Sequence, residues 1–181
     1  MGTVRPRVLC SVGLFGCVAL LVGCDHATKL AAEATLRDRA PLQIVPGVMD
    51  LTYTENHGVA FSALERLAIH PAAWLLVLFA LAATAVVVTV WIRQGRRASA
   101  VEHAGFALVV GGAMGNALDR LARGAVVDFV HVRFWPVFNV ADVLVAVGLG
   151  LLLLARSRAR AARAQRPPAS GVPGGTGSTH G

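Results

Sequence analysis

The sequence is poor in charged and aromatic residues. Of its 181 residues only 15% are charged and 6% are aromatic, whereas 55% are hydrophobic, and the mean hydropathy is +0.62. Disordered chains show the opposite balance, because they hold too few apolar residues to build a core. The shortage of charge therefore excludes a disordered or fibrous protein.

Cysteine is also scarce, and its placement excludes two further classes. The three cysteines, Cys10, Cys17 and Cys24, all lie in or at the end of the first apolar run. None has a second cysteine or a histidine cluster at the spacing of a zinc site, so the pattern gives neither a disulfide framework nor a zinc motif. We expect no metal and no cofactor.

Acidic residues are outnumbered by basic ones, which gives a formal net charge of +7 and a pI near 10.9. Such a balance can indicate a protein that binds nucleic acid. No nucleic-acid recognition motif accompanies the charge, however, and basic residues at the ends of membrane segments account for it. We expect no nucleic-acid partner.

Long apolar runs dominate what is present. They contain almost no charged side chains and are longer than ordinary core elements, and a helix needs about 20 such residues to cross a bilayer. The third run is short and rich in glycine, so it must use flanking residues to span. The predicted fold class is an all-α polytopic membrane protein, one domain over 1–166, with four transmembrane helices at about 8–24, 71–92, 101–120 and 136–155.

The arginines predict how these spans are oriented. They gather before the first span, between the second and third spans, and after the fourth, at Arg5, Arg7, Arg93, Arg96, Arg97 and from Arg156 to Arg166. Loops rich in arginine stay in the cytoplasm. Both termini are therefore predicted to be cytoplasmic, in a bacterial cytoplasmic (inner) membrane, and a long loop over 25–70 and a short connection over 119–133 lie outside.

The long outer loop has its own structure in this interpretation. Residues 42–61 are rich in β-branched and turn residues, which predicts a small extracytoplasmic β-rich region between spans one and two, lying on the membrane surface. Residues 27–37 predict a short helix that continues from span one. Residues 167–181 consist mainly of Pro, Gly, Ser and Thr and predict a disordered cytoplasmic tail.

The N-terminus has a second interpretation. Two arginines, an apolar stretch and Leu21-Val22-Gly23-Cys24 together look like a signal peptide with a lipid-attachment cysteine. Three more apolar spans follow, however, and no flexible polar tether comes after Asp25. We expect an uncleaved anchor instead.

Polar side chains gather at the outer ends of the predicted spans. Several pairs are three or four residues apart and so share a helix face. Ion pairing at the interface is the favoured explanation for a single charge, such as Arg120 or Lys29 alone. Two carboxylates, two amides and an arginine at one depth are costly unless paired or functional. The residues are Asp25, Lys29, Asn116, Asp119, Arg120, Asp128, Asn139 and Asp142.

A glycine-rich stretch, residues 111–115, comes just before Asn116. Small residues allow neighbouring helices to approach closely, and this packing role is the favoured interpretation. A phosphate-binding loop is poorly supported, because no Lys-Ser/Thr follows and the stretch lies within a predicted span.

Five ordered motifs carry a resemblance to a known family. They are Asp25-His26-Ala27-Thr28-Lys29, Asn56-His57-Gly58-Val59-Ala60-Phe61, the stretch from Gly111 to Arg120, Val127-Asp128-Phe129, and Phe138-Asn139-Val140-Ala141-Asp142. In this order and on four spans, they resemble bacterial lipoprotein signal peptidase, also called signal peptidase II. The resemblance covers nearly all of the chain except its two ends.

The resemblance implies an intramembrane aspartic endopeptidase that removes signal peptides from diacylglyceryl-modified prolipoproteins, cleaving before the lipidated cysteine. Asp128 and Asp142 stand at the positions of the catalytic pair, near the outer membrane face. The other matching positions are Asn56, Asn116, Arg120 and Asn139, which line the site, and Asp25, Lys29 and Gly58, which support it. The implied partners are diacylglyceryl-prolipoproteins and membrane lipids, and we expect a monomer.

The chemistry of two carboxylates agrees with this implication. One ionised carboxylate takes a proton from water, while a protonated one polarises the scissile carbonyl, and two such groups close together in low dielectric share a proton. Which of Asp128 and Asp142 holds that proton stays open. The competing classes are a small transporter or channel and a structural subunit of a membrane assembly. The sequence lacks the internal repeats and mid-span charges typical of transporters.

Overall fold

The structure is a computed structural model that describes residues 6–58, 73–95 and 98–165. Three parts of the sequence predictions lie outside these residues. They are the end of the β-rich loop (59–61), the start of the second span (71–72) and the C-terminal tail (167–181).

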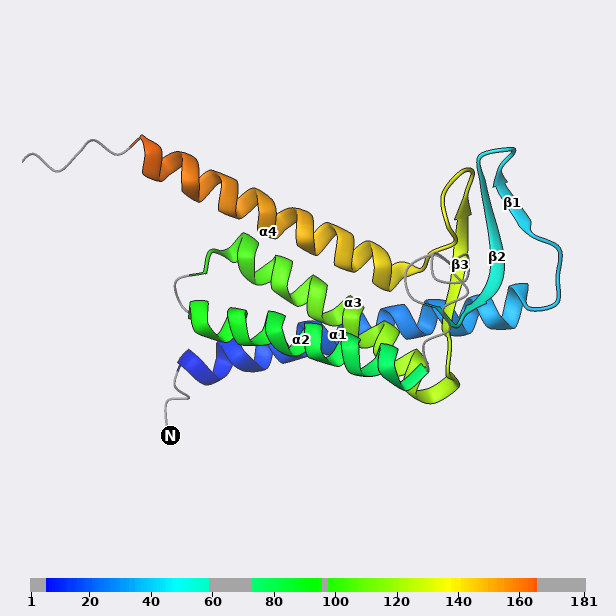
Figure 1. The fold of residues 1–181 in the computed structure, drawn as a ribbon, viewed down its shortest axis with the longest axis horizontal. Coiled ribbons are helices and arrows are strands. Elements are labelled where there is room, and N and C mark those ends of the chain that lie inside the picture. The colour runs from blue at the N-terminus through cyan, green and yellow to red at the C-terminus, as the bar shows by residue number, and fades with distance from the viewer. Residues whose placement is uncertain (1–5, 59–72, 96–97, 166–181) are drawn as a thin grey trace, which may run out of the picture.

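Helices make up most of the described chain. In these residues there are four, α1 (Pro6–Leu36), α2 (Ala73–Gln94), α3 (Ala100–Arg123) and α4 (Val140–Ala164), and each overlaps a predicted span. A small sheet lies at one end of the helices, and the described start of α1 and end of α4 lie at the other (Figure 1). The two described ends of the chain therefore lie on one side of the helices and the sheet on the other.

Two of the described helices have the length and composition needed to cross a membrane, Phe15–Leu36 within α1 and Val140–Ala162 within α4. Few of the residues in either segment are buried inside the protein, unlike those of a soluble core helix. Large apolar side chains such as Phe15, Phe79 and Leu153 are exposed. Exposed apolar surface of this extent is typical of contact with lipid. That all four helices span the membrane remains a prediction.

The helix boundaries refine the predicted ones. α1 runs without interruption through Cys24, which confirms the helix expected to continue from span one. α3 extends beyond 101–120 at both ends. A capping box between Ser99 and Glu102 starts it, and Gly124, at a φ of 76°, ends it. α4 begins at Val140, later than the expected 136, so Asn139 lies just before the helix.

The sheet contains a strand that the sequence analysis did not predict. Its described strands are β1 (Leu42–Val45), β2 (Met49–Asn56) and β3 (Val126–Val132), antiparallel in the order β1-β2-β3. The strands expected within 42–61 are confirmed. β3 lies in the connection expected over 119–133, so the β-structure is not limited to the first loop. Val126 and Val127 are buried, and pairing with β2 satisfies the backbone of their strand.

Glycines bring α3 and α4 together at a very short distance. A Cβ on Gly112 would lie 2.4 Å from the carbonyl oxygen of Ala141, and one on Gly148 would lie 2.7 Å from the carbonyl oxygen of Gly105. A Cβ on Gly115 would lie 2.5 Å from Oδ2 of Asp25 on α1. These contacts confirm the packing role predicted for the glycine-rich stretch. They also place the first turn of α4 directly against α3.

Candidate active site

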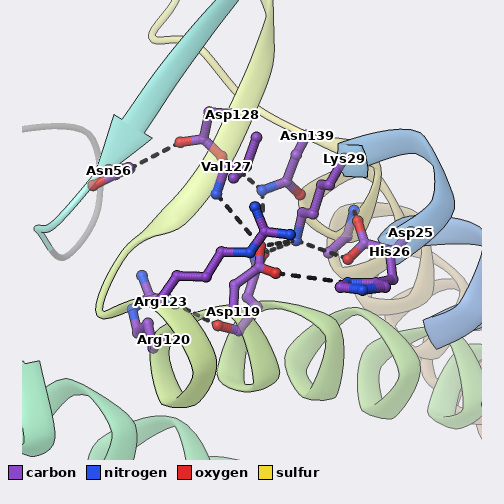
Figure 2. Close-up of polar contacts among 12 residues, drawn as sticks. Asp25, His26, Lys29, Asn56, Asp119, Arg120, Arg123, Val127, Asp128 and Asn139 are labelled. Carbon is purple, nitrogen blue, oxygen red and sulfur yellow. Dashed lines mark hydrogen bonds and ion pairs between the residues drawn. The ribbon is translucent and has the colours of Figure 1, made fainter. Parts of the chain in front are cut away.

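Lys29 lies at the centre of a buried polar cluster between α1 and α3. Its side chain is 0% exposed, and its Nζ lies 2.7 Å from Asp25 Oδ2 and 2.9 Å from Asp119 Oδ2. The side chains of Lys29, Asp25 and Asp119 lie together in Figure 2. The same ammonium donates a hydrogen bond to Asn116 Oδ1 at 2.9 Å. Three acceptors match the three N–H groups of an ammonium, which is how a buried charge is tolerated. The face shared by Asp25 and Lys29 was predicted from their spacing.

Asp119 belongs to this cluster although it was not among the predicted site residues. Its side chain is 2% exposed, and Oδ2 also accepts a hydrogen bond from the backbone N–H of Val127 at 3.4 Å. Nδ1 of His26 lies 4.0 Å from its other oxygen. Asp119 therefore ties α3 to both α1 and β3. Its signal in the sequence was its position three residues after Asn116, which puts both side chains on one face of the helix.

Asp128 is buried on β3, with 3% of the residue exposed. Its Oδ2 accepts a hydrogen bond from Asn56 Nδ2 at 3.0 Å, and its Oδ1 accepts one from Asn139 Nδ2 at 2.6 Å. Burial raises the pKa of Asp128 to about 6, against the lowering effect of the Asn56 hydrogen bond, and the nearby charge of Asp142 adds to the rise. This carboxyl therefore holds its proton to a higher pH than an ordinary aspartate.

Asp142 is half-buried in the first turn of α4. Its Oδ1 accepts a hydrogen bond from Asn116 Nδ2 at 2.8 Å, and its Oδ2 accepts one from the backbone N–H of Asn139 at 3.1 Å. The backbone N–H of Asp142 in turn donates to Asn139 Oδ1 at 3.1 Å. This reciprocal capping fixes the carboxylate against the start of the helix.

Two amides join the carboxylates into one network. Asn139 Nδ2 donates to both Asp128 Oδ1 and Asn116 Oδ1, the second at 3.1 Å. Since Asn116 also donates to Asp142, a continuous chain of hydrogen bonds runs from one aspartate through the amides to the other. The structure thus brings together the predicted residues Asp128, Asp142, Asn56, Asn116 and Asn139, which come from β2, β3, α3 and the start of α4.

Arg120 contacts the backbone around the site. Its guanidinium donates to the carbonyl of Asn116 through Nη1 and to the carbonyl of Gly58 through Nη2, both at 3.3 Å. The backbone N–H of Gly58 donates to Asn56 Oδ1 at 3.0 Å. Arg120 and Gly58 together therefore hold the chain after β2 in a position where Asn56 reaches Asp128.

The cluster lacks the composition of a metal centre. Across residues 6–58, 73–95 and 98–165, no group of three or more His, Cys, Asp and Glu side chains is placed to hold an ion. Each described aspartate of the network is instead bound by amide, backbone or ammonium donors.

Fold and site together define a class. Helices with apolar side chains facing outward, and a buried network of carboxylates and amides beside a small sheet at one end, are typical of an enzyme that works within a membrane. The family profile described as Signal peptidase (SPase) II matches residues 17–157. The chain belongs to the signal peptidase II family, a family of bacterial membrane peptidases, as its motifs predicted.

Individual relatives agree with this assignment. A lipoprotein signal peptidase of Oleidesulfovibrio alaskensis is 35% identical over 148 residues, which cover 80% of this chain and 92% of that protein. One of Allorhizobium ampelinum is 40% identical over 128 residues, covering 68% and 75%. A solved bacterial membrane enzyme has the same fold, with a TM-score of 0.74 at 21% identity over 86% of this chain and 94% of its own.

Proposed function

We propose that this chain is an aspartic endopeptidase that removes signal peptides from diacylglyceryl-modified prolipoproteins by cutting before the lipidated cysteine. The observation that carries the proposal is the pair Asp128 and Asp142, joined through the amides of Asn116 and Asn139. The names of the relatives, lipoprotein signal peptidase, supply the substrate class.

In the proposed reaction, the ionised member of the pair takes a proton from a water molecule, whose oxygen attacks the scissile carbonyl. The protonated member donates a hydrogen bond to the carbonyl oxygen as it becomes an oxyanion. A proton then passes to the leaving amine, and the peptide C–N bond breaks. Asn56, Asn116 and Asn139 hold the two carboxyl groups in register, so that no reorganisation is needed during the step.

The proposed placement puts the sheet and the aspartates at the outer face of the cytoplasmic membrane, with both termini in the cytoplasm. The charge of the arginine-rich segments supports this orientation. The exposed apolar side chains of the helices supply a surface for membrane lipids. One chain holds all of the residues of the network, and we propose that the enzyme acts as a monomer.

The lipid on the substrate is expected to decide whether it is cut. Two acyl chains bury many methylenes at about 0.8 kcal/mol each and hold the modified cysteine at one depth, where the aspartates can reach its preceding peptide bond. We expect purified enzyme in detergent to cleave a diacylglyceryl precursor at least tenfold faster at saturating concentration than the same precursor without lipid, because positioning contributes to rate. Mass spectrometry of the products measures both rates and the cleavage site.

Equal turnover of the two precursors would contradict the lipid requirement and favour a general intramembrane protease. Absence of cleavage for both, with ion or proton flux across vesicles containing the protein, would favour the transporter class instead. A precursor in which serine replaces the lipidated cysteine is the matched control, since it keeps the signal helix and changes only the attachment point.

A dependence on pH follows from the burial of Asp128. Its raised pKa of about 6 means that the proton is present below this pH and is lost as pH rises through it. If Asp128 supplies the protonated carboxyl, kcat/KM for a lipidated precursor is expected to fall above about pH 6. Rates measured from pH 4 to pH 9 test this expectation, and a profile that stays flat from pH 5 to pH 9 would contradict it.

A further inference from the structure

Lys29 is the only lysine in the chain, and its side chain is fully buried. Among the described residues, Lys29 makes no hydrogen bond to Asp128 or Asp142. Its bond to Asn116, however, is one step from Asp142. This connection links Lys29 to the aspartate pair, in addition to its bracing of α1 against α3.

The bond fixes which way the amide of Asn116 points. Asn116 Oδ1 accepts hydrogen bonds from Lys29 Nζ at 2.9 Å and from Asn139 Nδ2 at 3.1 Å. If the amide turned by half a rotation, its NH₂ group would face an ammonium and another NH₂, with no acceptor for any of them. The surrounding donors therefore allow one orientation, and Nδ2 of Asn116 must face Asp142.

In that orientation, both oxygens of Asp142 face hydrogen-bond donors and act as acceptors. Oδ1 faces the Asn116 amide and Oδ2 faces the backbone N–H of Asn139, at the start of α4, where the helix dipole also favours negative charge. A protonated carboxyl would point its O–H at one of these donors. Asp128 lies in a more buried position and has no helix N-terminus behind it. Asp128 also faces two donors, the amides of Asn56 and Asn139, so what distinguishes the two aspartates is the helix N-terminus at Asp142 and the deeper burial of Asp128.

We propose, on the basis of the proposed function, that Lys29 is a positioning residue. By orienting Asn116, it keeps Asp142 as the ionised acceptor of the pair. Asp142 is then the base that takes the proton from water, and Asp128 is the acid that faces the substrate carbonyl.

Other charged groups surround Asn116 and Asp142 and bear on any pH measurement. Asp25 comes from α1, Asp119 and Arg120 come from α3, and Asp128 comes from β3, with His26 at 4.0 Å from Asp119. Removing Lys29 alone changes the net charge beside all of them. A test of orientation must therefore keep the net charge constant.

The charge-neutral double variant Lys29→Met with Asp25→Asn meets this requirement. It removes one positive and one negative charge and leaves Asn139 Nδ2 as the remaining described side-chain donor to Asn116 Oδ1, so the orientation of Asn116 is held less firmly. We expect the acid limb of the kcat/KM profile to move up by about one pH unit, so that activity at the acid limb falls about tenfold. The fall is expected in kcat more than in KM, with the basic limb unchanged.

Two further variants separate orientation from charge and from folding. Asp25→Asn alone leaves the Lys29 to Asn116 bond in place and is expected to lack the upward shift. Lys29→Met with Asp119→Asn is a second charge-neutral pair, expected to give the same upward shift through the other carboxylate. Circular dichroism and size-exclusion chromatography in detergent select the variants that fold for the kinetic comparison.

An acid limb in either folded double variant that coincides with that of the wild type would overturn the proposal, because Lys29 would then act through charge or packing alone. A drop in protein yield with an unchanged pH profile of kcat/KM would also overturn the proposal. These outcomes leave the proposed function intact, since they require wild-type enzyme that cleaves. Wild-type enzyme that does not cleave a lipidated precursor contradicts the proposed function itself.

Discussion

Asp128→Asn and Asp142→Asn are each expected to lower prolipoprotein cleavage by a factor of about 10² to 10⁴, the usual worth of a general acid or base. The substitution keeps the size and shape of the side chain but removes the exchangeable proton. Asp128 accepts two amide N–H groups and Asp142 accepts one amide and one backbone N–H. An asparagine can keep one of these bonds at each site, so the helices and the sheet are expected to remain folded.

The measurement is single-turnover cleavage of a lipidated precursor by variants that match the wild type in helix content and membrane insertion. Asp38→Asn is the matched control, because Asp38 is exposed, lies in the turn after α1, and has a φ of 60° that asparagine adopts readily. It should retain full activity. If either site variant keeps more than about a hundredth of the wild-type rate, the corresponding aspartate has no role in proton transfer.

Gly112→Ala is expected to have the second largest effect, although it adds only one methyl group. The new Cβ would lie 2.4 Å from the carbonyl oxygen of Ala141 and 2.9 Å from Cγ2 of Val145. Backbone atoms cannot yield as flexible side chains do, so α4 must move away from α3. Overpacking of this kind costs about 1 to 3 kcal/mol, and a shift of about 1 Å in a catalytic group costs about a hundredfold in rate.

Thermal unfolding in detergent and cleavage rate both report the effect of Gly112→Ala. We expect a lower midpoint and at least a tenfold loss of activity, because Asp142 directly follows Ala141 and moves with it. Gly150→Ala on the same helix is the control, since no atom lies within 4 Å of its added Cβ. It should preserve activity and raise helix stability by about 0.5 to 1 kcal/mol. Wild-type behaviour of Gly112→Ala would mean that the helices do not pack this closely.

The helices could be predicted because each follows from a local pattern of residues. A long apolar run specifies a helix without reference to the rest of the chain, and the glycine-rich stretch specifies close packing. β3 could not be predicted in this way, because its stability depends on pairing Asn56 with Val126 and Thr54 with Asp128, residues far apart in the sequence. Only the folded chain brings these partners together.

The site was predictable to a similar degree. Spacing of three or four residues correctly paired Asp25 with Lys29 and Asn139 with Asp142. What spacing cannot give is a contact between elements, such as the bond from Lys29 to Asp119 or from Asn56 to Asp128. For this reason Asp119 was grouped with the polar residues at the span ends but was not predicted as a site residue. Arg120, which was expected to line the site, bonds to the carbonyls of Asn116 and Gly58, and the charges of Asp128 and Asp142 also act on it.

The single buried lysine also provides a built-in probe of unfolding. Every other basic side chain that carries a fixed charge is an arginine, so Lys29 is the only side-chain amine that an acylating reagent can modify. At 0% exposure it is shielded while α1 and α3 stay together, and it reacts only when they separate. The rate of acylation at this one position, read by mass spectrometry in native membranes, would follow the opening of the helix bundle without purification or an added label.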